Sequence, residues 1–75
     1  MTIGDLEVGA VARVIGFSKG SSQYRSRLLA MGVTMGESVQ IRRVAPMGDP
    51  VELLLKGFAL VLRKDEAATV LVERM

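Results

Sequence analysis

The sequence predicts a mainly β protein, a small antiparallel β-barrel of about five strands that carries one short α-helix. Short stretches alternate apolar and polar residues, and turns that contain Gly or Pro separate them. Only the segment Ser21–Glu37 has a convincing helical pattern. The stretches lack the spacing of βαβ units, so the strands are expected to pair in antiparallel fashion and to close on themselves.

Length and composition restrict the class of protein further. The chain has 75 residues, which is the size of one domain, and we expect residues 1–75 to form a single unit. Hydrophobic residues make up 49% of it, which excludes intrinsic disorder. The net charge is +2, and acidic and basic residues are interleaved along the chain. The N-terminal residues are acidic where a signal peptide is basic, and no apolar run approaches the ~20 residues of a membrane span. We therefore expect a cytoplasmic protein without direct membrane insertion.

The strands are predicted from residues that alternate between two faces, as the pleat of a β-strand requires. Gly16 interrupts the first alternating stretch and indicates a bulge. Arg43 breaks the alternation of the second stretch, so a bulge is expected near Arg42 and Arg43. The five predicted strands are Ala10–Phe17, Ser38–Ala45, Val51–Lys56, Phe58–Arg63 and Thr69–Glu73.

The same alternation assigns side chains to faces. In the later strands the inward residues are expected to be Val39, Ile41, Val51, Leu53, Leu55, Val70 and Val72. Leu54 is expected to point outward. In the first strand Val11, Ile15 and Phe17 share one face, and Ala12 and Val14 share the other. In the fourth, Phe58, Leu60 and Leu62 lie on one side, and Ala59, Val61 and Arg63 lie on the other. Of the three aromatic residues, only Tyr24 is expected to be exposed.

The connections carry recognisable turn signals. Thr2–Gly9 is expected to plug one end of the barrel through Ile3, Leu6 and Val8. Gly36 permits a type II turn over Thr34–Glu37, and Pro46–Pro50 is the strongest turn signal in the chain. Gly57 indicates a tight reversal, and Lys64–Ala67 is expected to form a single helical turn.

The helix has a signal at each end. Ser21 or Ser22 can cap the first turn by accepting a hydrogen bond from a free backbone N–H. Gly32 stands where a left-handed residue ends a helix, and Val33 follows to pack back on the last turn.

The helix also has an apolar face. Tyr24, Leu28 and Met31 form a stripe at helical spacing, and Leu29 widens it. A helix this short is not stable alone in water, so it must pack against the strands.

Residue types argue against catalysis. The chain has no His and no Cys, which removes the usual general base, thiol nucleophiles, disulfides and the commonest transition-metal ligands. The acidic residues lack the spacing of a metal-binding loop, and Asp65 and Glu66 are interpreted as solvated or as capping a helical turn. The loop after the first strand lacks the GxxxxGK[ST] spacing of a phosphate-binding loop. We expect no enzyme, no cofactor and no metal site.

Two kinds of binding surface remain open. Outward or turn residues could form an apolar patch for protein contacts, namely Tyr24, Leu29, Met35, Met47 and Leu54. Four arginines could instead form a basic patch for nucleic acid, with Tyr24 stacking on a base: Arg25, Arg27, Arg42 and Arg43. Leu54 could also support weak self-association of the chain into a homo-oligomer.

A series of motifs then suggests a family. Their order is Arg27-Leu28, Met31-Gly32-Val33, Gly36, Ala45–Pro50, Gly57, Ala59–Arg63, Glu66-Ala67 and Val70–Glu73, and Leu6 and Gly9 fit the opening. In these features the chain resembles the FeoA family, the small cytoplasmic accessory proteins of bacterial ferrous iron uptake. The resemblance covers nearly the whole chain. Met35 departs from it, since the family often has Pro there.

The resemblance implies an SH3-like barrel and a partner. That partner is the membrane ferrous iron transporter FeoB, contacted through its cytoplasmic GTPase portion, and nucleic acid is then not expected. The resemblance brings no catalytic residues, and without His or Cys no iron ligands are assigned to this chain. The partner-binding residues are expected on the helix and the turn after it: Tyr24, Arg25, Arg27, Leu28, Leu29, Met31 and Met35. The two arginines would steer the partner electrostatically. Leu28 and Met31 have the alternative of belonging wholly to the core. The alternative function is a small barrel that binds nucleic acid through the arginine patch.

Overall fold

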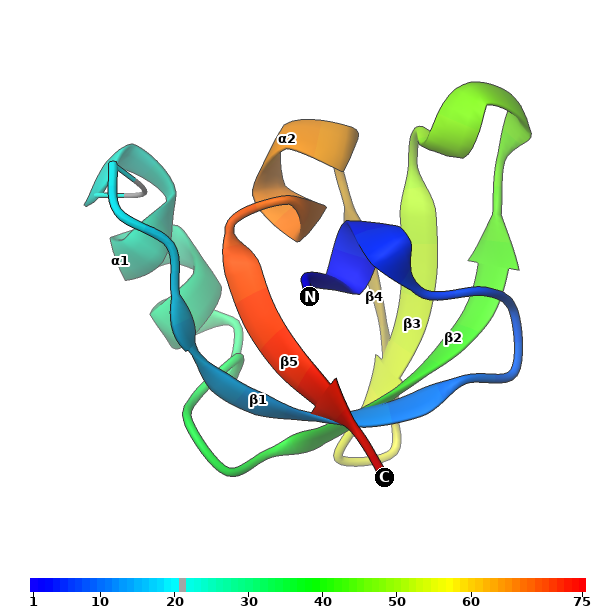
Figure 1. The fold of residues 1–75 in the computed structure, drawn as a ribbon, viewed down its shortest axis with the longest axis horizontal. Coiled ribbons are helices and arrows are strands. Elements are labelled where there is room, and N and C mark those ends of the chain that lie inside the picture. Colours follow the sequence, from blue (N-terminus) through cyan, green and yellow to red (C-terminus); the bar gives the residue numbers. More distant parts are fainter. Residues whose placement is uncertain (21) are drawn as a thin grey trace.

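The computed structural model describes residues 1–20 and 22–75, and its main feature is one curled antiparallel sheet (Figure 1). The strands are β1 (Val11–Phe17), β2 (Ser38–Val44), β3 (Val51–Leu55), β4 (Phe58–Leu62) and β5 (Val70–Arg74). They pair in the order β4-β3-β2-β1-β5, so β4 and β5 are the two edges of the sheet. The predicted mainly β architecture with one short helix is confirmed.

The core lies inside the curled sheet and is formed by the predicted alternating residues. The inward residues expected in β2, β3 and β5 are all at most 4% exposed: Val39, Ile41, Val51, Leu53, Leu55, Val70 and Val72. In β1 the inward residues are Ala12 and Val14, whereas Val11 and Ile15 are 38% and 46% exposed.

Both predicted bulges are present. The pairing of β1 with β5 shifts between Val14 and Gly16, and the pairing of β2 with β3 shifts between Ile41 and Arg43. A bulge bends its strand and increases the local twist, which helps a single sheet curl around its own core.

The strand β4 differs from the prediction at its first residue. Phe58 pairs with the buried Leu55, yet its side chain is 71% exposed. The expectation that Tyr24 is the only exposed aromatic residue was therefore wrong. Alternation places Phe58 on the inner side, but β4 is an edge strand, so Phe58 has a neighbouring strand on one side only.

The turn between β3 and β4 is a two-residue hairpin. Lys56 and Gly57 both have positive φ, 53° and 82°, as a type I′ hairpin turn requires. Lys56 thus belongs to the turn and not to the preceding strand, and the predicted reversal at Gly57 is confirmed.

The N-terminal segment closes one end of the barrel, and two of its three predicted apolar side chains pack there. A 3₁₀ turn, Ile3–Asp5, places Ile3 in the core, and Leu6 is also buried. Val8 is 59% exposed, so its predicted packing on the barrel was wrong. Thr2 forms a bridge with Leu71 of β5.

The helix α1 (Ser22–Ala30) ends as predicted. Gly32 has φ 95°, its N–H donates to the Leu29 carbonyl at 3.0 Å, and the Val33 N–H donates to the Leu28 carbonyl at 3.0 Å. These two bonds are those of a Schellman motif. A capping role for Ser21 lies outside the described residues, and Ser22 is the first residue of α1.

The second helix, α2 (Lys64–Ala67), is the predicted single turn and connects the two edge strands of the sheet. Another 3₁₀ turn, Pro46–Gly48, follows β2. Within residues 1–20 and 22–75, no helix has the length and apolar character needed to cross a membrane.

Candidate protein-docking surface

The helix α1 lies along one side of the barrel (Figure 1), and its residues divide between core and surface. Leu28 is fully buried, and Tyr24 and Met31 are half-buried against the core. Leu28 therefore cannot contact a partner, and its place in the expected binding set is corrected to the core. The physical reason is that a helix this short needs at least one deeply buried anchor to remain on the sheet.

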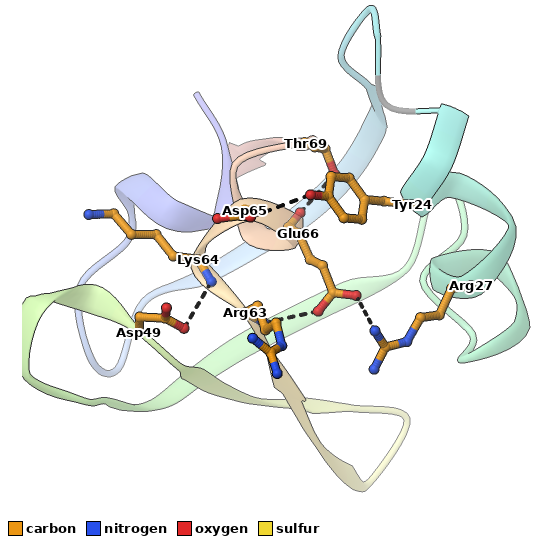
Figure 2. A network of polar contacts seen from close by, with 8 residues as sticks. All are labelled: Tyr24, Arg27, Asp49, Arg63, Lys64, Asp65, Glu66 and Thr69. Carbon is orange, nitrogen blue, oxygen red and sulfur yellow. Dashed lines mark hydrogen bonds and ion pairs between the residues drawn. The ribbon is translucent and has the colours of Figure 1, made fainter.

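A polar network around α2 holds α1 in place (Figure 2). Its centre is Glu66, whose side chain is 1% exposed. One carboxylate oxygen, Oε1, accepts a hydrogen bond from the Arg63 backbone N–H at 3.0 Å. The other, Oε2, lies 2.9 Å from Nη1 of Arg27 on α1 and makes no regular hydrogen bond within the described residues. The Arg27 guanidinium is thus the neighbour that compensates the buried charge.

Two further contacts extend this network. The Tyr24 hydroxyl lies 3.4 Å from Oδ2 of Asp65, which gives α1 a second, longer link to α2. The Lys64 backbone N–H donates to Oδ1 of Asp49 at 3.2 Å, which connects α2 to the segment before β3.

The burial of Glu66 was missed by the sequence interpretation, which took Asp65 and Glu66 as solvated or capping residues. The capping interpretation is confirmed for Glu66, because its carboxylate accepts a hydrogen bond from the Arg63 N–H at the start of α2. The burial follows from α1 lying over this turn and supplying Arg27. The spacing from Arg63 to Glu66 was the available signal, since a Glu at the third position of a helix often accepts this hydrogen bond.

The side chains of α1 left for a partner are therefore few. Arg25 lies over the Phe17 ring, with its guanidinium carbon 5.4 Å from the ring centroid. Leu29 is 42% exposed, and Met35 in the following turn is 69% exposed. We define the α1 surface as Tyr24, Arg25, Leu29, Met31 and Met35.

The four arginines of the nucleic-acid alternative do not form one patch. Arg27 is paired with Glu66, and Nε of Arg42 lies 3.7 Å from Glu52. Figure 1 shows α1 and the second half of β2, which carries Arg42 and Arg43, on opposite sides of the molecule.

Met47, which is 88% exposed in the 3₁₀ turn after β2, is likewise distant from α1, so the expected apolar patch does not include it.

No metal site is evident among the residues that the structure describes. None of their acidic side chains come together in groups of three or more.

Leu54, which was considered for self-association, is half-buried on β3.

Comparison with known proteins then defines the family. A model of the FeoA domain matches residues 1–74. The chain belongs to the FeoA family. A curated relative is the fusion protein of Fe(2+) transport protein A and Fe(2+) transporter FeoB from Porphyromonas gingivalis, which is 30% identical over 73 residues. These residues are 97% of this chain but only 8% of the fusion protein.

Solved FeoA structures have the same fold. The FeoA-like protein of Clostridium acetobutylicum is 37% identical with a TM-score of 0.90, and the match covers all of this chain and 86% of that one. The FeoA of Stenotrophomonas maltophilia, solved with zinc and described as a prokaryotic SH3 domain protein, is 26% identical with a TM-score of 0.83 over 97% of this chain and 89% of that one. The predicted FeoA membership and SH3-like barrel are thus confirmed. A manganese-dependent transcriptional repressor has a TM-score of 0.90 at 11% identity, with 100% of this chain and 41% of that chain covered, which shows a shared fold alone.

Proposed function

We propose that this FeoA-family chain is a non-catalytic accessory protein of ferrous iron uptake, and that it binds the cytoplasmic GTPase portion of the membrane transporter FeoB. The observation that supports this best is the Porphyromonas gingivalis relative, in which FeoA and FeoB are parts of one polypeptide. Fusion raises the effective concentration of one binding module for another, so it favours two proteins that act together.

The α1 surface is the proposed contact. It combines a half-buried aromatic residue, Tyr24, with the exposed apolar residues Leu29 and Met35. Interfaces are enriched in Tyr, Met and Arg at their centres, and Met adapts its shape to a partner. The Arg27–Glu66 pair fixes α1 on the barrel and the Schellman motif orders its end, so little order has to be acquired on binding.

The experiment is a titration of the purified chain with the purified GTPase portion of the transporter. The wild-type chain is expected to bind, and Leu29→Ala or Tyr24→Ala is expected to weaken binding by about fivefold to thirtyfold. Tyr24→Phe keeps the ring and removes only the hydroxyl that faces Asp65. Met35→Ala has a matched control in Met47→Ala, since both side chains are exposed methionines in turns on different sides of the molecule.

Each outcome has a separate meaning. Absence of binding by the wild-type chain contradicts the proposed function. Binding that is unchanged in the folded α1 variants contradicts only the placement of the contact. Binding of RNA or DNA that weakens steeply with salt would favour the alternative function instead.

A further inference from the structure

The strand β4 leaves one edge of the sheet open. It pairs with β3 along its whole length, and no other strand of the described residues pairs with it. The opposite edge, β5, is partly covered by the N-terminal residues. Thr2 forms a bridge with Leu71, and the Val72 N–H donates to the Met1 carbonyl at 2.9 Å.

The register shows which backbone groups face the open edge. Leu55 and Phe58 close the two-residue hairpin, so they exchange both hydrogen bonds. The alternation of an antiparallel ladder then directs the N–H and C=O groups of Ala59 and Val61 away from β3. Neither residue takes part in any other backbone hydrogen bond within the described part of the chain. Two donors and two acceptors are therefore available to an additional strand.

The edge also lacks the features that usually prevent strand addition. Natural edge strands carry charges, Pro or bulges. The residues of β4 are all uncharged and apolar, and their pairing with β3 has no register shift. Phe58 and Val61 are 71% and 55% exposed. A strand added here would cover apolar side chains as well as satisfy backbone groups.

Charge around β4 decides which kind of strand fits. Arg63 and Lys64 follow β4 and are exposed. Lys56 precedes β4 and is also exposed, but its Nζ lies 3.4 Å from a carboxylate oxygen of Glu37. Glu52, across from Val61, is the acidic residue on the neighbouring strand, and it is already paired with Arg42. A second copy of this chain paired antiparallel along all of β4 would bring the Lys56 turn of one copy towards Lys64 of the other at both ends, and its β4 carries no acidic residue. Like charges brought close together are destabilising, so an acidic strand is favoured over a second copy.

We propose that the β4 edge accepts an extended segment of a partner protein as a sixth strand, and that this segment alternates apolar and acidic residues. Backbone hydrogen bonds at Ala59 and Val61 would supply affinity, and Arg63 and Lys64 would select acidic sequences. This edge is separate from the α1 surface, and its test uses no part of the transporter.

The test is a titration of the isotope-labelled chain with two synthetic peptides, DVEVEVD and KVKVKVK, followed by amide NMR and hydrogen exchange. The acidic peptide is expected to shift the amides of Ala59 and Val61, to protect them from exchange, and to bind at least about tenfold more tightly than the basic peptide. Equal binding of both peptides, no binding of the acidic one, or shifts confined to other elements would overturn the proposal.

Two variants isolate the backbone contribution. Val61→Pro removes an N–H that faces the open edge, and Pro is tolerated on edge strands. Val61→Thr keeps the N–H and the β-branched shape. Val61→Pro is expected to weaken binding of the acidic peptide by about fivefold or more, and Val61→Thr is expected to weaken it by much less. If Val61→Pro does not fold, the exchange protection of the wild-type chain decides the question alone. If sedimentation shows that the wild-type chain forms dimers and that a folded Val61→Pro variant does not, the proposal is also overturned, because the edge would then be occupied by a second copy.

Discussion

Replacement of Arg27 by Ala removes the cation that lies 2.9 Å from the buried carboxylate of Glu66. Glu66 would keep its hydrogen bond from the Arg63 N–H, but Oε2 would have no compensating charge. The loss of one partner of a buried charge costs about 3–5 kcal/mol when both groups are buried. Here the Arg27 side chain is 63% exposed, so water screens part of the interaction.

We therefore expect Arg27→Ala to lower the free energy of unfolding by about 2 kcal/mol, within the ~1–3 kcal/mol of an unsatisfied buried acceptor. The total for a chain of this size is about 4–11 kcal/mol, so the loss is a large fraction of it. The expected fall in Tm is about 10 °C. Glu66→Gln in the Arg27→Ala background should recover part of the loss, because a neutral amide needs no cation.

The assay is urea unfolding followed by circular dichroism, and the control is Arg25→Ala. Arg25 is on the same helix and lies over the Phe17 ring, a contact that contributes about 0.5–1 kcal/mol at an exposed site. Equal destabilisation by the two alanine variants would refute the reasoning, because the buried charge would then have no special dependence on Arg27.

Three further predictions concern the helix and the termini. Leu28→Ala should destabilise by about 2–4 kcal/mol and Leu29→Ala by less than about 1 kcal/mol, because only Leu28 is fully buried; urea unfolding compares the two. Gly32→Ala should destabilise by about 1–2 kcal/mol, because φ is 95° and the new Cβ would lie 3.2 Å from a leucine methyl of β3; a Tm equal to wild type would contradict this. The hydrogen bonds from Arg74 lower the pKa of Glu7 from 4.5 to about 2. Since the pKa of Glu7 is lower in the folded state, its ion pair with Arg74 contributes its full stabilisation above about pH 5 and loses it as the pH falls towards 2. The difference in Tm between wild type and Glu7→Gln should therefore close over that range.

Local patterns in the sequence were sufficient for most of the fold. The alternation of apolar residues in β2, β3 and β5 gives the inward face directly, because the pleat fixes the direction of each side chain. The end of α1 was predictable from Gly32 and Val33, because the Schellman motif is made by residues within one turn.

The deviations depend on neighbours that are distant in the chain. Phe58 alternates like a core residue, but only the strand order shows that β4 is an edge and leaves it exposed. Glu66 resembles a solvated carboxylate until α1 places Arg27 against it. The stripe of Tyr24, Leu28 and Met31 could not be divided between core and surface from its period, since the division depends on how the helix rotates against the sheet.

The most direct test of the proposed function is an NMR titration of the isotope-labelled chain with the unlabelled GTPase portion of FeoB. The proposed contact predicts saturable amide shifts at the end of α1 and through the following turn, at residues such as Leu29, Met31 and Met35, with little change around Met47. Absence of shifts at any concentration would contradict the proposed association with the transporter. Saturable shifts confined to the turn around Met47 or to the β4 edge would contradict the α1 surface as the contact.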